Sequence, residues 1–276
     1  MIPVLFKIGP LPIYSYGLML GLAFLTGSYV LARELRRKKM DANIASTITL
    51  LAVVFGIAGA KLLFLLEHWN SFISDPIGMA FSPGGLTWYG GFVLGIGAII
   101  LYIRSKKIPI LKFLDALGIA LILAYGIGRI GCHLAGDGDY GFPTDLPWGT
   151  NYEHGTYPPS RAFAVLPEVS SEYPGGVVPD NTPCHPTPVY EFILGVIGFV
   201  VLRSLWGKKY ADGKLFMIYL ILSNAFRFSI EFLRLNPRLA FGLSEAQLIA
   251  AVIFFIGIVG MLLIDKKSTD ASAATP

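Results

Sequence analysis

Several ionisable side chains lie within long apolar stretches of this 276-residue sequence, where an uncompensated charge is costly. Among them are Lys61, Arg129, Glu191, Arg227, Glu231 and Arg234. If these stretches cross a bilayer, each charge costs at least roughly 2.5–3.5 kcal/mol on insertion scales, so such residues indicate a functional site. Arginine binds phosphate through a planar fork that donates two parallel hydrogen bonds. The arginines therefore predict a site for a phosphate group, such as a lipid headgroup.

The spacing of three of these residues places them on one side of a helix. Arg227, Glu231 and Arg234 follow one another at intervals of four and three, so their side chains share a helix face. One carboxylate neutralises one guanidinium, and we therefore expect a surplus arginine that needs another anion. Arg129 is expected at a similar depth in another helix. Structural ion pairing between helices is the alternative for Arg227 and Glu231.

Two other patterns near Arg129 contain residue types that occur in catalytic and metal-binding sites. Cys132 and His133 are a potential nucleophile and base, but adjacent residues on a helix point about 100° apart. Residues 137–141 resemble part of a calcium-binding loop without its remaining ligands and its closing glutamate. Their glycines and aspartates favour a tight turn instead. We therefore expect no metal and no cofactor.

The composition indicates a membrane protein. Hydrophobic residues make up 54% of the chain and charged residues only 14%, whereas soluble domains carry about 25% charged residues. This excludes an ordinary cytosolic enzyme, and the high apolar content excludes intrinsic disorder. No stripe of basic residues interleaved with aromatic residues is present, so we expect no binding to nucleic acid.

Seven apolar runs are long enough to cross a bilayer as helices, since such a helix needs about 20 residues. The runs cover residues 13–32, 44–66, 86–103, 111–134, 189–206, 215–235 and 244–264. Strands of a membrane barrel would be shorter and would alternate in polarity. The sequence therefore predicts an all-α polytopic membrane protein, with a single seven-helix membrane domain over residues 1–276.

Basic residues predict the orientation of these helices. Clusters of lysine and arginine lie within residues 33–39, 104–112, 203–214 and 266–267. With seven spans, all four clusters fall on one side of the membrane, and positive loops are typically cytoplasmic. We therefore expect the N-terminus outside and the C-terminus in the cytoplasm.

The longest polar segment, residues 135–186, lies between the fourth and fifth predicted helices and therefore on the outer side. It contains nine prolines and seven glycines, which prevent long helices, and seven acidic residues against one basic residue. We expect a turn-rich outer head. A disulfide between Cys132 and Cys184 is an open alternative, because the outer side permits oxidation.

Several motifs, in the same order along the chain, resemble those of the bacterial prolipoprotein diacylglyceryl transferases. They are the Y-G segment at residues 14–19, the G-G-x-x-x-Y-G-G stretch at 84–91, the G-R-x-G motif at 128–131 followed by Asp137 and Gly141, the H-P-x-x-x-Y-E motif at 185–191, and A-F-R-x-x-x-E-F-x-R at 225–234. The family has histidine at the position of Tyr89, asparagine at that of Cys132 and arginine at that of Lys61. The resemblance covers nearly the whole chain.

The resemblance implies a reaction and its partners. Members of the family transfer the diacylglyceryl group of phosphatidylglycerol to the lipobox cysteine thiol of a prelipoprotein, forming a thioether and releasing glycerol phosphate. The implied partners are phosphatidylglycerol, prelipoprotein signal peptides with a lipobox cysteine, and the surrounding membrane lipids. The implied location is the bacterial plasma (inner) membrane. This chemistry fits the arginines, because a phosphate leaving group needs cations where its charge develops.

The resemblance also implies residue roles. Catalytic roles fall to Arg129, Arg227, Glu231, Tyr16 and Tyr89. Substrate-binding roles fall to Lys61, Asp137, Gly141, His185, Tyr190, Glu191 and Arg234. Tyr89 would donate a hydrogen bond to the lipid ester or phosphate, or, as a phenolate, take the thiol proton.

Two alternatives to this function are open. A lipid transporter or flippase would carry its charges near the middle of the membrane, whereas these charges are expected in the outer half. A relative of the family that acts on a different phospholipid or acceptor is the second alternative.

Overall fold

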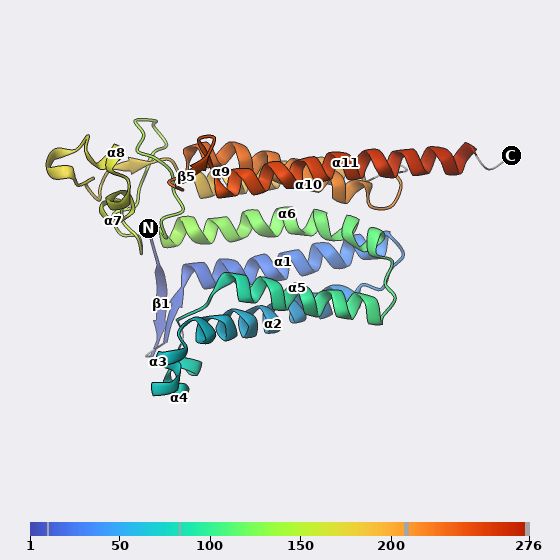
Figure 1. The fold of residues 1–276 in the computed structure, drawn as a ribbon, viewed down its shortest axis with the longest axis horizontal. Helices are drawn as coiled ribbons and strands as arrows, with labels where there is room; N and C mark the ends of the chain where they lie inside the picture. Colours follow the sequence, from blue (N-terminus) through green and yellow to red (C-terminus); the bar gives the residue numbers. More distant parts are fainter. Residues whose placement is uncertain (10, 83, 207–209, 274–276) are drawn as a thin grey trace. The chain divides into compact units, whose positions relative to one another are not determined.

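Seven long apolar helices dominate the computed structural model, which describes residues 1–9, 11–82, 84–206 and 210–273 (Figure 1). They are α1 (Ser15–Arg37), α2 (Asn43–Glu67), α5 (Trp88–Ser105), α6 (Ile110–Ala135), α9 (Thr187–Leu205), α10 (Lys214–Ile230) and α11 (Glu245–Ala273). Each is long and apolar enough to cross a membrane. The predicted all-α polytopic fold with seven helices is therefore confirmed.

The end of α10 differs from the prediction. The α-helix stops at Ile230, a 3-10 turn η3 covers Glu231–Leu233, and Arg234 is extended at φ −91° and ψ 159°. Pro237 lies shortly beyond this point and disfavours a helical conformation in the residue before it. The prediction that Arg227, Glu231 and Arg234 share one continuous helix face is therefore wrong at Arg234.

The chain forms two compact units, Met1–Val30 with Leu114–Pro276, and Leu31–Phe113. The single seven-helix membrane domain stays a prediction. In the first unit, glycines let α9 approach α6 closely. A side chain at Gly198 would come within 2.3 Å of the Ile122 side chain, and one at Gly195 within 2.9 Å of its carbonyl oxygen. Small residues at such contacts are typical of membrane helices. This packing brings the first turns of α9 beside the last turns of α6.

The first unit also contains the polar segment between α6 and α9. Its short elements are β3 (Thr150–Asn151), α7 (Pro159–Ala162), η1 (Phe163–Val165), α8 (Pro167–Ser170), η2 (Pro174–Gly176) and β4 (Pro183–Cys184). They surround a small core in which Tyr140 and Tyr152 stack at 4.2 Å between ring centroids. Cys184 is buried in this core, and Cys132 and Cys184 are both free thiols. The disulfide alternative is therefore wrong.

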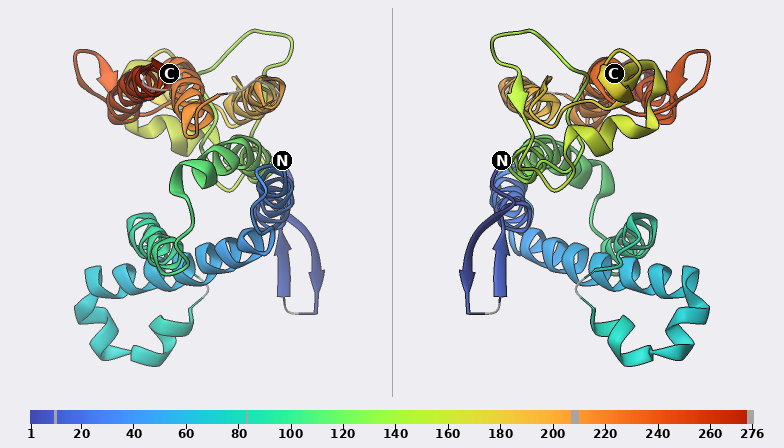
Figure 2. Two further views of the ribbon diagram at one scale, coloured as in Figure 1. Left: turned by 90° about the vertical axis from the view of Figure 1, so that its right-hand side faces the viewer. Right: turned by 90° about the vertical axis from the view of Figure 1, so that its left-hand side faces the viewer.

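A hairpin at the N-terminus precedes α1. Strands β1 (Val4–Ile8) and β2 (Leu11–Tyr14) pair in antiparallel fashion (Figure 2). The first residues of the predicted span at 13–32 thus form a strand, and the helix starts at Ser15. After η3, strands β5 (Arg238–Ala240) and β6 (Leu243–Ser244) form a second hairpin that leads into α11.

In the second unit, α2 and α5 pack through glycines. A side chain at Gly59 would come within 2.3 Å of the carbonyl oxygen of Gly90, and one at Gly90 within 2.2 Å of that of Gly59. The connection between them contains α3 (Trp69–Ser74) and α4 (Pro76–Phe81). Lys208 and Lys209, which belong to the third basic cluster, lie outside the described residues. The orientation in the membrane stays a prediction.

Candidate active site

Three helix ends position the candidate site within the first unit. Arg129 lies in the last two turns of α6, Glu191 in the first two turns of α9, and Arg227 in the last turn of α10. The polar segment joins the end of α6 to the start of α9, and α10 runs back toward that same end (Figure 1). All three side chains therefore lie at one end of the membrane-spanning helices.

Glu191 is the carboxylate that these arginines share. Its Oε2 lies 3.2 Å from Nε of Arg129 and 3.3 Å from Nη1 of Arg234, and its Oε1 lies 3.5 Å from Nη1 of Arg227. The Tyr125 hydroxyl donates a 2.5 Å hydrogen bond to the same Oε1. With only 3% of its side chain exposed, Glu191 is screened from water, and its charge depends on these partners.

Asp139 links two of the arginines. One carboxylate oxygen pairs with Nη1 of Arg129 and the other with Nη2 of Arg234. Burial alone would raise the pKa of Asp139, but the guanidinium groups of Arg234 and Arg129 lower it below its ordinary value. Asp139 is therefore ionised at neutral pH and acts as a bridging anion.

Glu231 fixes the arginines from the side of η3. Its Oε2 lies 2.9 Å from Nη1 of Arg227 and 3.6 Å from Nε of Arg234. Its Oε1 accepts hydrogen bonds from the Ser244 hydroxyl at 2.8 Å and from the Asn236 amide at 2.5 Å. Since its side chain is fully buried, Glu231 is a structural anchor of the arginines.

The resulting network balances its charges. Three guanidinium groups, of Arg129, Arg227 and Arg234, meet three carboxylates, of Asp139, Glu191 and Glu231. The expectation of a surplus arginine was wrong, because Asp139 supplies the third negative charge. Sequence reasoning assigned Asp139 no role, although the excess of acidic residues in its segment indicated that anions were near.

Comparisons with known proteins show the family of the chain. A family model described as prolipoprotein diacylglyceryl transferase matches residues 3–263. The chain belongs to the prolipoprotein diacylglyceryl transferase family. A relative from Clostridium tetani, named phosphatidylglycerol–prolipoprotein diacylglyceryl transferase, is 31% identical over 259 residues, covering 93% of this chain and 95% of the relative. Relatives with the same name from Parasynechococcus marenigrum (99% and 97% covered) and Leptospira interrogans (80% and 71% covered) are each 29% identical.

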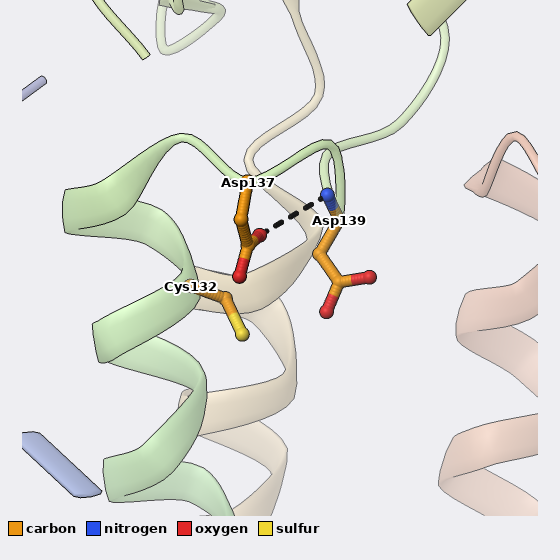
Figure 3. A group of neighbouring side chains, drawn as sticks. All are labelled: Cys132, Asp137 and Asp139. Carbon is orange, nitrogen blue, oxygen red and sulfur yellow. Dashed lines mark hydrogen bonds between the residues drawn. The ribbon is translucent and has the colours of Figure 1, made fainter. Parts of the chain in front are cut away.

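In this member of the diacylglyceryl transferase family, the Cys132 thiol lies close to two carboxylates, those of Asp137 and Asp139. Its Sγ and the carboxylate oxygens of Asp137 and Asp139 lie within 4.8 Å of one another (Figure 3). The backbone N–H of Asp139 donates a 3.3 Å hydrogen bond to Asp137. Such a spacing suits a metal ion, but both oxygens of Asp139 already pair with arginines, whose charge would repel a cation. The geometry favours the internal ion network.

A cavity of about 380 Å³ opens beside Asp137. It is lined by Pro3, Tyr14, Tyr16, Gly17, Ala135, Asp137 and Thr156. Burial, and then the charge of Asp139, raise the pKa of Asp137. The structure thus brings together Tyr16 and Asp137, two residues that the resemblance to the transferase family implicated.

Gly141 has a structural reason to be glycine. Its N–H donates a 2.9 Å hydrogen bond to the carbonyl of His185, and it forms a β-bridge with Arg234. A Cβ at this position would lie 2.3 Å from the carbonyl oxygen of Leu233. Gly141 therefore lets the polar segment approach the backbone that carries Arg234, and we assign it a positioning role.

His185 and Tyr190 form a separate polar pair near the start of α9. The His185 Nδ1 lies 3.4 Å from the Tyr190 hydroxyl, which accepts a 2.7 Å hydrogen bond from the Trp148 indole N–H. Burial lowers the pKa of His185. These hydrogen bonds lead to the surface of the polar segment, so a contact of His185 or Tyr190 with substrate stays a prediction.

Lys61 and Tyr89 belong to the second unit, where Lys61 lies on α2 and Tyr89 at the start of α5. The Lys61 ammonium donates hydrogen bonds to the Ser82 carbonyl at 3.0 Å, the Ser82 hydroxyl at 2.9 Å and the Gly84 carbonyl at 2.9 Å. These three hydrogen bonds match the three N–H donors of the ammonium. Tyr89 is 61% exposed, and its ring meets Trp88 edge-on at 5.4 Å. Roles of both residues toward substrate stay predictions.

Proposed function

We propose that this chain transfers the diacylglyceryl group of phosphatidylglycerol to the cysteine thiol of a prolipoprotein. Its family membership and the names of its relatives support this reaction. The observation in the structure that carries the proposal is the convergence of Arg129, Arg227 and Arg234 at one end of the spans. Such a group of cations suits a lipid phosphate at the membrane surface.

The reaction needs positive charge where these arginines lie. The thiolate sulfur attacks the carbon of the diacylglycerol unit that is bonded to the phosphate oxygen. A C–S bond forms there, and the C–O bond to the phosphate breaks. The bonding electrons go to the leaving oxygen, so the phosphate gains one negative charge as glycerol phosphate is released. Preorganised guanidinium groups stabilise this charge more in the transition state than in the bound lipid, which accelerates the reaction.

The arginines have different roles in this proposal. Arg129 and Arg227 are partly exposed and both pair with Glu191, so we assign them the main contacts with the phosphate. Arg234 is more deeply buried and holds Asp139, Glu191 and Glu231 together. It positions the two others, and its Nη2 group, which pairs with Asp139, is a further donor to the phosphate.

The location of the charges also distinguishes an enzyme from a transporter. A transporter of lipids is expected to place its binding charges near the middle of the membrane, in interrupted helices. Here Arg129, Glu191 and Arg227 occupy the last or first turns of continuous helices. This favours chemistry at the membrane surface. We further infer that this surface is the outer face of the bacterial plasma membrane, where a prolipoprotein signal peptide with a lipobox cysteine arrives.

Radiolabelled phosphatidylglycerol tests the proposal. The purified chain is incubated with the lipid and a lipobox peptide, and a peptide with serine in place of the cysteine is the control. We expect the label on the cysteine peptide alone and release of glycerol phosphate. Label on neither peptide, with the protein folded, would contradict the proposed reaction. Phosphatidylethanolamine and phosphatidylserine, offered in parallel, test the lipid headgroup.

Tyr89 is included in the same assay because it stands at the family's histidine position. Tyr89→Phe keeps the ring and removes only the hydroxyl, and Tyr89→His restores the residue of the family. We propose that the hydroxyl donates a hydrogen bond to the lipid, so the Phe variant should lose activity. Full activity in Tyr89→Phe would assign Tyr89 to packing alone.

A further inference from the structure

Asp139 differs from the other two carboxylates of the network in its exposure. Its side chain is 29% exposed, whereas those of Glu191 and Glu231 are 3% and 0% exposed. Glu191 lies on a helix and Glu231 on the turn that ends one, but Asp139 lies on the segment after α6, between Gly138 and Gly141. Asp139 is therefore the anion of the network that a ligand from outside can most easily replace.

The backbone of Asp139 is nevertheless fixed. The buried hydroxyl of Thr187 donates a 2.6 Å hydrogen bond to the Asp139 carbonyl, and the Gly141 N–H is bound by His185. Gly138 adopts a left-handed conformation with φ 90°, which shapes the turn before Asp139. Because the backbone is held, displacement of the carboxylate requires a rotation of the side chain and no rearrangement of the segment.

The carboxylate of Asp139 also matches a phosphate in charge and geometry. Among the described residues, the other ion pairs of Arg129, Arg227 and Arg234 are with Glu191 and Glu231, so without Asp139 three guanidinium groups pair with two carboxylates. Asp139 supplies one negative charge through two oxygens on two different guanidinium groups. A phosphodiester also carries one negative charge and binds such N–H groups in the same manner.

We propose that Asp139 competes with the phosphate ester for the N–H groups of Arg129 and Arg234, an inference that rests on the proposed function. The lipid phosphate displaces the carboxylate, which rotates toward solvent, and the carboxylate returns as glycerol phosphate leaves. A phosphate monoester carries about −1.5 to −2 charges at neutral pH, so the three arginines would retain this product strongly without a competing anion. Asp139 therefore lowers the affinity for the product and permits turnover.

Binding and kinetics of Asp139→Asn test this competition. The variant keeps the shape of the side chain and removes its charge. We expect glycerol phosphate to bind about fivefold to tenfold more tightly than to the wild type, because the competing charge is lost. We also expect a lower KM for phosphatidylglycerol and a lower kcat, since product release becomes slower. A merely structural role would weaken binding or leave it unchanged.

Three further variants make the test specific. Asp145→Asn removes an exposed charge from the same segment and should leave the affinity for glycerol phosphate within about twofold of the wild type. Asp139→Glu keeps the competing negative charge and should therefore bind glycerol phosphate less tightly than Asp139→Asn does. Asp139→Ser replaces the Asn variant if the latter does not fold. The proposal would be overturned if the uncharged variants bound glycerol phosphate no more tightly than the wild type. It would also be overturned if Asp139→Glu bound glycerol phosphate as tightly as Asp139→Asn.

The measurements also separate this inference from the proposed function. Glycerol phosphate, inorganic phosphate and phosphatidylglycerol in nanodiscs are titrated separately, so that the free phosphate and the lipid headgroup are distinguished. Tighter binding of all three in Asp139→Asn supports the competition. If lipid transfer depends on Arg129 but Asp139→Asn binds none of them more tightly, the proposed function stands and the competition is wrong. If transfer does not depend on Arg129, both are wrong.

Discussion

Arg129 and Glu191 form a 3.2 Å ion pair that joins two membrane-spanning helices, α6 and α9. Because Glu191 also pairs with Arg227 and Arg234, one buried carboxylate holds three arginines in place. The network is thus both a contact between helices and the framework of the site. Its dual role predicts that changes in it affect stability and activity together.

Glu191→Gln should strongly destabilise the protein. The substitution removes the negative charge shared by three partly or fully buried arginines, and breaking such a buried pair costs about 3–5 kcal/mol. We expect a lower Tm in detergent and loss of lipid transfer. Glu153→Gln, at an exposed position of the polar segment, is the matched control and should leave both unchanged. A wild-type Tm in Glu191→Gln would show that the ion pairs contribute little.

Gly141→Ala should displace Arg234. The new methyl group would lie 2.3 Å from the Leu233 carbonyl oxygen, and overpacking of this kind costs about 1–3 kcal/mol. We expect reduced stability and a larger loss of activity than the loss of folded protein explains. Gly97→Ala adds a methyl group in open space on α5 and should be tolerated. Wild-type activity in Gly141→Ala would remove the positioning role assigned to this glycine.

Acid should weaken the network through Asp139. Its guanidinium partners lower its pKa, although burial opposes them. An acid with a lowered folded-state pKa stabilises the protein above its unfolded pKa, near 3.9, and loses this contribution as the pH falls through the folded-state pKa. The Tm difference between the wild type and Asp139→Asn should therefore be constant at neutral pH and shrink below about pH 4. A difference that grows toward acid pH would contradict this assignment.

Labelling of introduced cysteines tests the orientation. We expect a membrane-impermeant thiol reagent to label Glu153→Cys in intact cells, and Lys106→Cys, between α5 and α6, only after lysis. The native Cys132 and Cys184 are buried, so the wild type should give low background. The reverse pattern would place the polar segment in the cytoplasm.

The sequence was sufficient for those parts of the fold that depend on local hydrophobicity. The apolar run at 44–66 became α2, Asn43–Glu67, because a continuous apolar stretch of that length has few alternatives to a membrane helix. The end of α10 was mispredicted, since the apolar pattern continues through Phe232 and Leu233 while the backbone already turns toward β5. Periodicity does not detect where tertiary contacts end a helix.

The candidate site was predicted only in part. Arg129, Glu191, Arg227 and Glu231 were found because a charge in an apolar run stands out, and the structure brings them together. Asp139 was missed because it is one of several acidic residues in a polar segment. Its pairing with Arg234 joins positions 95 residues apart, and no local pattern reports such a contact. Tyr125, which donates to Glu191, was missed because a tyrosine in an apolar helix is unremarkable.

The transfer of radiolabelled diacylglyceryl to a lipobox peptide by Arg129→Lys decides whether Arg129 contacts the lipid phosphate. Lysine keeps the charge but loses the planar fork, so the phosphate and Glu191 cannot be bound at once. Arg161→Lys, at an exposed position of the polar segment, is the control and should transfer at the wild-type rate. We expect Arg129→Lys, folded as judged by its Tm, to transfer about 10²–10³ times more slowly than the wild type. A near wild-type rate in Arg129→Lys would contradict this contact.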